Sequence, residues 1–207
     1  HELGLPDLYD TDNSSEGIGH WGVMASGSWA DNGETPVYFS AWSRYWLGWV
    51  DPIPITDDIN NLVMEPVEDG GDVYMLPIPG NWSGSKEYFL IENRQQMKYD
   101  LYLAGEGLLI WHINESQNGN SNDYNRLVDL EQADGLYQLN SGYNDGDLSD
   151  PYPGTMNITR FANETIPSSQ FNNGSTSNII VTNIIENDEL ITATFQNMPS
   201  LDIINIS

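Results

Sequence analysis

The chain opens with His1-Glu2-Leu3-Gly4-Leu5-Pro6-Asp7, whose residue types and spacing can bind a metal ion. They match the second half of the extended zinc-binding pattern H-E-x-x-H-x-x-G-x-x-H/D, with His1 as the second histidine. A glycine three residues after that histidine permits a sharp turn, so that the chain doubles back and supplies a further ligand. We interpret Gly4 as this turn and His1 and Asp7 as zinc ligands. The alternative is an ordinary helix end followed by a loop.

A methionine in a glycine-flanked turn follows, within the run Trp21-Gly22-Val23-Met24-Ala25-Ser26-Gly27. Such a turn, downstream of the zinc-binding residues, is the second mark of the metzincin proteases. There the thioether forms an apolar floor beneath the histidine ligands and does not bind the metal. Met24 beside a tryptophan is also typical of core packing, and the two interpretations agree.

Two runs, HELGLPDLYDTDNSSEGIGHWGVMASGSW and PVYFSAWSRYWLGWV, closely resemble the immune-inhibitor-A-like family of bacterial secreted zinc metalloproteases. The later segments YFLIENRQQ, GEGLLIWHINE, VDLEQADG and DPYPG are similar to further characteristic segments of that family. The resemblance runs in order from residue 1 to about residue 196. It implies a secreted, zinc-dependent endopeptidase that hydrolyses peptide bonds in protein substrates by a metal-activated water, with a β-rich region after the catalytic one.

The resemblance also implies that some catalytic groups are not among these 207 residues. The first zinc histidine and the general-base glutamate of the family would precede His1, and Glu2 occupies a spacer position. We therefore assign no catalytic residue here, and expect the partner of this chain to be the N-terminal half of the catalytic domain. Because catalytic zinc sites use three protein ligands plus a water, we expect this fragment alone to be inactive.

A non-catalytic function is the alternative hypothesis. In it, the chain is a secreted β-sandwich module that binds carbohydrate or protein and keeps only a remnant of the zinc motif. The aromatic residues that could serve such binding are Trp46, Trp49, Trp82 and Trp111, although core packing is the commoner role of such residues.

Composition excludes several partners. The chain has 6 basic and 31 acidic residues, a formal charge of −25, and such a surface repels nucleic acid and anionic membranes. It has no cysteine, which excludes disulfides and thiolate metal ligands. No apolar run approaches the roughly 18 to 20 residues that a membrane span needs. We expect no nucleic acid partner and no membrane span.

Two acidic loops are candidate calcium sites, because carboxylates are hard oxygen ligands for Ca²⁺. The candidate ligands are Asp10, Asp12 and Glu16 in the first loop and Asp145, Asp147 and Asp150 in the second. Neither loop has the full EF-hand spacing, and simple turn chemistry is the alternative.

The pattern of apolar residues predicts the elements that position these groups. Pro36 suits the first turn of a helix, and Trp42 and Trp46 recur at helical spacing, which predicts one short helix that ends near Gly48. Short apolar or alternating runs then predict strands at 61–67, 72–78, 86–92, 106–113, 178–185 and 189–195, the last two forming a hairpin. Residues 115–126 and 140–177 are expected to be loops. His112 lies in an apolar run and is interpreted as a hydrogen-bonded strand histidine.

The expected fold class is α+β and mostly β. A remnant of a metzincin-like catalytic C-terminal subdomain is followed by an antiparallel β-sandwich-like region. The expected domains are residues 1–50 (zinc motif remnant, methionine turn and short helix) and residues 51–197 (β-rich domain). Residues 198–207 are expected to be a tail or linker.

Overall fold

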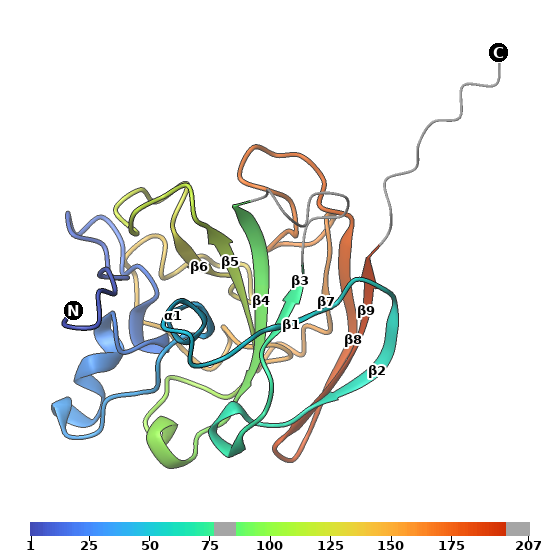
Figure 1. Ribbon diagram of the computed structural model, residues 1–207, viewed down its shortest axis with the longest axis horizontal. Helices are drawn as coiled ribbons and strands as arrows, with labels where there is room; N and C mark the ends of the chain where they lie inside the picture. Colours follow the sequence, from blue (N-terminus) through green and yellow to red (C-terminus); the bar gives the residue numbers. More distant parts are fainter. Residues whose placement is uncertain (77–85, 198–207) are drawn as a thin grey trace.

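In the computed structural model, residues 1–76 and 86–197 are described, and two β-sheets dominate them (Figure 1). The five-stranded sheet has the order β1-β3-β4-β5-β6, which is Ile53–Pro54, Tyr74–Leu76, Glu87–Arg94, Gly107–Asn114 and Val128–Leu130. The four-stranded sheet has the order β2-β9-β8-β7, which is Ile59–Met64, Leu190–Asn197, Ile179–Asn187 and Arg160–Phe161. Every pair of neighbours is antiparallel except β1 and β3. The expected mostly-β fold class is confirmed.

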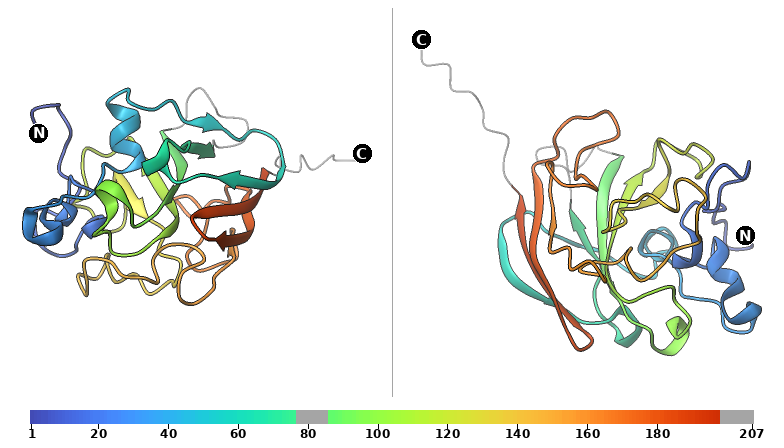
Figure 2. Two further views of the ribbon diagram at one scale, coloured as in Figure 1. Left: turned by 90° about the horizontal axis from the view of Figure 1, so that it is seen from below. Right: turned by 180° about the vertical axis from the view of Figure 1, so that it is seen from behind.

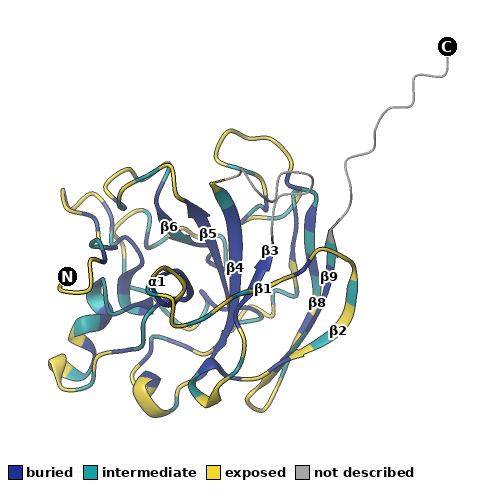
Figure 3. Ribbon diagram, in the orientation of Figure 1, coloured by how far each residue is buried: buried dark blue, intermediate teal, exposed yellow. Residues whose placement is uncertain are grey.

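The five-stranded sheet is covered on both faces. Successive side chains of a strand point to opposite faces, so Phe89 and Ile91 pack toward the four-stranded sheet while Leu90 packs toward the N-terminal segment. The same alternation holds along β5, which is buried at every position and therefore reads as a continuous apolar run. Figures 1 and 2 show this sheet between the N-terminal segment with α1 on one side and β2, β8 and β9 on the other. Figure 3 shows that β4 and β5 are the buried centre.

The helix α1, Ala41–Trp46, begins later than Pro36, so the predicted start of the helix is wrong. Ser40 caps it by accepting a hydrogen bond from the backbone N–H of Ser43. Residues before Ser40 are extended because they pair elsewhere: Val37 N donates to Gly27 O, and Tyr38 O accepts from Val23 N. The other helical elements are short 3-10 turns: η1 (Gly19–Trp21), η2 (Ser26–Gly33), η3 (Val67–Asp69) and η4 (Lys98–Asp100). Within the described residues, no helix combines the length and the apolar character needed to cross a membrane.

Most of the predicted strands are found, with shifted ends. The runs at 86–92 and 106–113 are β4 and β5, and the predicted hairpin is confirmed as the antiparallel pair β8 and β9. The short strand β6 was not predicted, and β7 lies inside the region 140–177 that was expected to be a loop. Residues 77–78 of one predicted strand, Trp82 and the predicted tail 198–207 lie outside the described residues. The division at residue 50 stays a prediction.

A buried group of charges joins the N-terminal segment to the five-stranded sheet. Glu92 and Arg94 lie on the face of β4 that is turned toward α1, and both side chains are completely buried. Glu92 pairs with Arg44 of α1 and accepts hydrogen bonds from the backbone N–H of Ala41, at 3.2 Å, and from Trp111 Nε1, at 2.8 Å. Because buried charges must be paired and hydrogen-bonded, this group fixes how α1 sits on the sheet.

Candidate metal centre

The N-terminal turn brings His1 and Asp7 together. Gly4 has φ +85°, in the left-handed region that favours glycine, and its N–H donates to His1 O at 2.8 Å. The chain reverses there, so His1 Nε2 and Asp7 Oδ1 come into hydrogen-bonding contact. Residues 1–4 form a turn. The expected convergence of imidazole and carboxylate is present, and their role as zinc ligands stays a prediction.

Met24 lies on the wall of the same cavity as these two residues. The turn that carries it is closed by a hydrogen bond from Ala25 N to Gly22 O, and Met24 O accepts from Leu8 N at 2.9 Å. The methionine turn is thus tied to the residue after Asp7. The Met24 side chain is half-buried and packs against the core, which agrees with its interpretation as a core residue. Its role as a support for a metal ligand stays a prediction.

The cavity between the His1–Asp7 turn and the methionine turn has a volume of about 610 Å³. Polar and apolar groups line it, including His1, Asp7, Tyr9 and Met24. A hydrogen bond with Asp7, together with the charge of that carboxylate, raises the pKa of the Tyr9 hydroxyl. Glu16 lines the cavity too, and its pKa is raised by a hydrogen bond with Asp145, by burial and by nearby negative charge. The cavity therefore offers one imidazole and several oxygen groups to a bound cation or a polar ligand.

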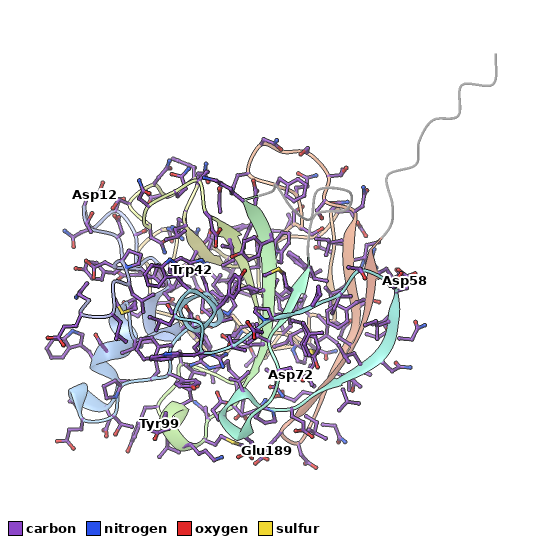
Figure 4. The ribbon with its side chains drawn as sticks, in the orientation of Figure 1. Asp12, Trp42, Asp58, Asp72, Tyr99 and Glu189 are labelled. Atoms are coloured by element: carbon purple, nitrogen blue, oxygen red, sulfur yellow. The ribbon has the colours of Figure 1, made fainter. Side chains whose placement is uncertain are left out.

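The first predicted calcium loop is organised by its own backbone. Burial raises the pKa of Asp10, but hydrogen bonds from Asp12 N, Ser14 N, the Ser14 hydroxyl and Ser15 N outweigh burial and lower it to about 2. This is the turn chemistry that was the alternative interpretation. Asp12 is exposed at the edge of the N-terminal segment (Figure 4). Calcium binding by Asp10, Asp12 and Glu16 stays a prediction.

The second predicted loop is split by the structure. Asp147 and Asp150 join Asp134, and one carboxylate oxygen from each lies within 4.8 Å of the others. Asp145 is not part of this group, since it faces Glu16 and the hydroxyl of Ser26, at 3.4 Å. The sequence reasoning missed Asp134. The only local signal was an Asp-Gly pair, which marks a turn and gives no indication of the residues it meets.

The remaining predicted histidine has the expected environment. His112 on β5 is buried, with Nδ1 at 3.1 Å from Glu131 Oε1 and Nε2 at 2.9 Å from Glu87 Oε1. Burial lowers the pKa of His112, but these two carboxylates outweigh it and raise the pKa to about 9. The interpretation of His112 as a hydrogen-bonded strand residue is confirmed.

Comparison with known proteins identifies the class of the N-terminal segment. Residues 1–49 match the family described as "Immune inhibitor A peptidase M6, catalytic domain". This segment is similar to the immune inhibitor A family of peptidases, as the sequence motifs predicted. The match covers both His1 and Asp7, the methionine turn and α1, and it supports a metalloprotease-related function.

Individual relatives agree with this class. The chain is 45% identical over 51 residues to "Pre-pro-metalloprotease PrtV" of Vibrio cholerae serotype O1, a match covering 23% of this chain and 6% of the relative. It is 52% identical over 44 residues to "Immune inhibitor A" of Bacillus thuringiensis subsp. alesti, covering 19% of this chain and 6% of the relative. The chain thus spans only 6% of the length of these curated relatives. The resemblance expected for residues 50–196 stays a prediction.

Proposed function

We propose that this chain contributes to the catalytic centre of a secreted zinc metalloendopeptidase, with His1 and Asp7 as two of the zinc ligands. The contact between His1 Nε2 and Asp7 Oδ1 on the wall of an open cavity carries the proposal. An imidazole nitrogen and a carboxylate oxygen are donors that zinc uses in proteins. The family match over residues 1–49 supports the same reaction class.

The donor set fits zinc but is incomplete in the described residues. Catalytic zinc sites use three protein ligands and leave a position for water or substrate. In the described part of the chain, no third histidine or carboxylate groups with His1 and Asp7 closely enough to complete such a set. We therefore propose that these 207 residues bind zinc weakly and do not hydrolyse peptides unaided.

Within the centre, the residues of this chain would position the reactants. Zinc, when bound, lowers the pKa of a coordinated water to about 7 and polarises the scissile carbonyl. The Tyr9 hydroxyl donates its proton to Asp7, so its oxygen, exposed at the cavity, is placed to accept a hydrogen bond from a substrate group. The hydrogen bond from Leu8 N to Met24 O fixes the position of the segment that carries His1 and Asp7 relative to the methionine turn.

A binding module is the second candidate function, and one observation favours it. Trp42 and Trp46 line a second cavity of about 460 Å³ together with Glu115, Gln117 and Asn118. Trp42 is buried, but the exposed ring of Trp46 beside carboxylate and amide groups suits a polar ligand that stacks and forms hydrogen bonds, such as a sugar. Trp111 is completely buried and is therefore no longer a candidate binding residue. Trp46 and Trp49 are about half exposed and remain candidates.

Zinc titration of the purified chain by calorimetry tests the first proposal. We expect binding that is lost in Asp7→Asn and retained in Asp12→Asn, a matched control on the same segment whose side chain is exposed and does not line the cavity. In the complete peptidase, Asp7→Asn should reduce both zinc content and peptide hydrolysis. Equal zinc binding by the two variants would remove Asp7 as a ligand, and peptide hydrolysis by the purified chain would show that the centre is complete without further residues.

A further inference from the structure

Three carboxylates from two loops meet at a site away from His1 and Asp7. Asp134 follows β6, and Asp147 and Asp150 lie in the loop that pairs with β5 through Tyr152. Their ligand oxygens lie within 4.8 Å of one another. A backbone hydrogen bond from Ala133 N to Asp150 O, at 2.8 Å, fixes the two loops side by side.

Asp150 has one oxygen that nothing in the described chain satisfies. The residue is completely buried. Its Oδ2 accepts two hydrogen bonds, from Trp21 Nε1 and from Asp147 N, each at 3.0 Å. Its Oδ1 is sealed from solvent and has no hydrogen-bond partner among the described residues. An unsatisfied, buried carboxylate oxygen is costly, which indicates that a ligand absent from the polypeptide satisfies it.

No cationic side chain in the described part of the chain balances these charges. Among the described residues, none of the ion pairs includes Asp134, Asp147 or Asp150. Burial, with a smaller effect from the charges of Asp147 and Asp134, raises the pKa of Asp150 to about 7, although the hydrogen bonds from Asp147 N and Trp21 oppose the rise. Burial and the charge of Asp147 also raise the pKa of Asp134. The site as it stands is short of positive charge.

We propose that Asp134, Asp147 and Asp150 form a binding site for a divalent cation, and that the cation is Ca²⁺. All three ligand groups are hard carboxylate oxygens, and the group contains no histidine, which argues against zinc. Ca²⁺–oxygen distances of about 2.3–2.6 Å place ligands on opposite sides of the ion about 5 Å apart, which accommodates the observed spread. All three ligands are carboxylates, a set that suits the variable coordination of Ca²⁺ better than the strict octahedron of Mg²⁺, which usually keeps several waters.

The cation would fix a loop that supports the N-terminal segment. Besides the bond from Trp21 to Asp150, His20 N donates to Asp145 O at 2.7 Å, so residues 145–150 lie directly against η1. Trp21 lies three residues before Met24, at the start of the segment that forms the methionine turn. Binding at this site is therefore expected to stabilise the methionine turn, and this expectation is independent of whether His1 and Asp7 bind zinc.

Calcium titration of the chelator-treated chain tests the site. We expect calorimetric binding of Ca²⁺, and a rise in melting temperature of roughly 5–10 °C at a concentration about 100 times the Kd. Terbium(III) substituted for calcium should emit on excitation of tryptophan, because the Trp21 indole lies next to a ligand. Added Ca²⁺ should quench that emission by displacement.

Two matched variants make the test specific. Asp134→Asn keeps an oxygen for the hydrogen bond from Leu136 N but removes one ligand charge, so it should lose the calcium response. In the presence of a chelator, the Asp134→Asn variant should melt no lower than the wild type, because one of the repelling charges has been removed. A normal melting temperature in chelator therefore distinguishes loss of calcium binding from loss of folding. Asp145→Asn, in the same loop but outside the group, should keep the response. Absence of any calcium effect up to about 10 mM, or an equal response in both variants, would overturn the proposal.

Discussion

The indole Nε1 of Trp21 donates a hydrogen bond of 3.0 Å to Oδ2 of Asp150, across 129 positions of the sequence. Both residues are completely buried. Trp21 lies within the segment that matches the peptidase family, and Asp150 lies outside it. Because Trp21 also shares one hydrophobic cluster with Leu90, Trp111 and Leu139, a change at this contact should destabilise the packing of both parts.

Gly146→Ala should therefore be strongly destabilising. Gly146 has φ +117°, and a Cβ atom there would lie 2.5 Å from Nε1 of the Trp21 indole. Gly174→Ala is the matched control, since Gly174 also has positive φ, +79°, but open space around a Cβ. We expect a backbone cost of about 1–2 kcal/mol in both variants, and about 1–3 kcal/mol more in Gly146→Ala from the clash. Urea unfolding measures the difference, and equal losses would contradict the contact.

Arg94→Met should cost about 3–5 kcal/mol, because it leaves buried carboxylates without their partner. Arg94 Nε donates to Asp100 Oδ2 at 2.6 Å and to Glu68 Oε1 at 3.1 Å, and the side chain is completely buried. The control is Arg160→Met, which breaks an exposed pair with Glu164 and should change stability by about 0–0.5 kcal/mol. Comparable losses for the two arginines in chemical denaturation would show that the buried pairs are not the cause.

Stability should fall as pH rises toward 8, and Glu68 should account for part of the fall. Burial and a hydrogen bond with Asp100 raise the pKa of Glu68 to about 8, although Arg94 opposes them. A folded-state pKa above the unfolded value means that the native state binds a proton more tightly than the unfolded state does. The resulting stabilisation is fully present below about pH 4.5 and is lost as the pH rises through about 8. Protonated Glu68 leaves Glu92 and Asp100 to balance Arg44 and Arg94, which explains why the proton is retained.

Glu68→Gln tests this pH dependence, since glutamine imitates the protonated acid. The slope of the unfolding free energy between pH 5 and 8 should decrease by up to about 1.4 kcal/mol per pH unit relative to wild type. Glu34→Gln removes an exposed glutamate and should leave the slope as it was. An unchanged slope in Glu68→Gln would assign the effect to other groups.

The local part of this structure could be predicted from the sequence. The apolar run that became β5 is continuous because both faces are covered, and the hairpin β8–β9 is bracketed by alternating residues and a turn. The convergence of His1 and Asp7 depends on a bend at Gly4 only three residues away from each. In these cases the determining interactions lie within a few residues.

Tertiary contacts set the features that the sequence did not reveal. The start of α1 was misplaced because Val37 and Tyr38 pair with the methionine turn instead of continuing the helix. Glu92 ends the strand predicted at 86–92 and Arg94 follows it; no local pattern shows that these two charged residues are buried beneath α1 and Trp21. Asp134 joins Asp147 and Asp150 only because β6 and the following loop meet at one edge of β5, which no local pattern encodes.

Gly4→Ala should weaken zinc binding without changing global stability. Gly4 holds φ +85°, and a Cβ atom there would lie 3.1 Å from the Trp46 ring, so alanine should relax the bend and move His1 away from Asp7. Restoring the bend on binding would cost about 1–2 kcal/mol, which corresponds to a loss of affinity of roughly 5- to 30-fold. The melting temperature should stay near that of wild type, because residues 1–4 are exposed and contribute little to the core. Gly70→Ala, at φ +93° with open space around a Cβ, is the control that should bind zinc like wild type. Calorimetric titration of both variants measures the difference, and unchanged affinity in Gly4→Ala would mean that the bend does not determine how the imidazole and the carboxylate meet the metal.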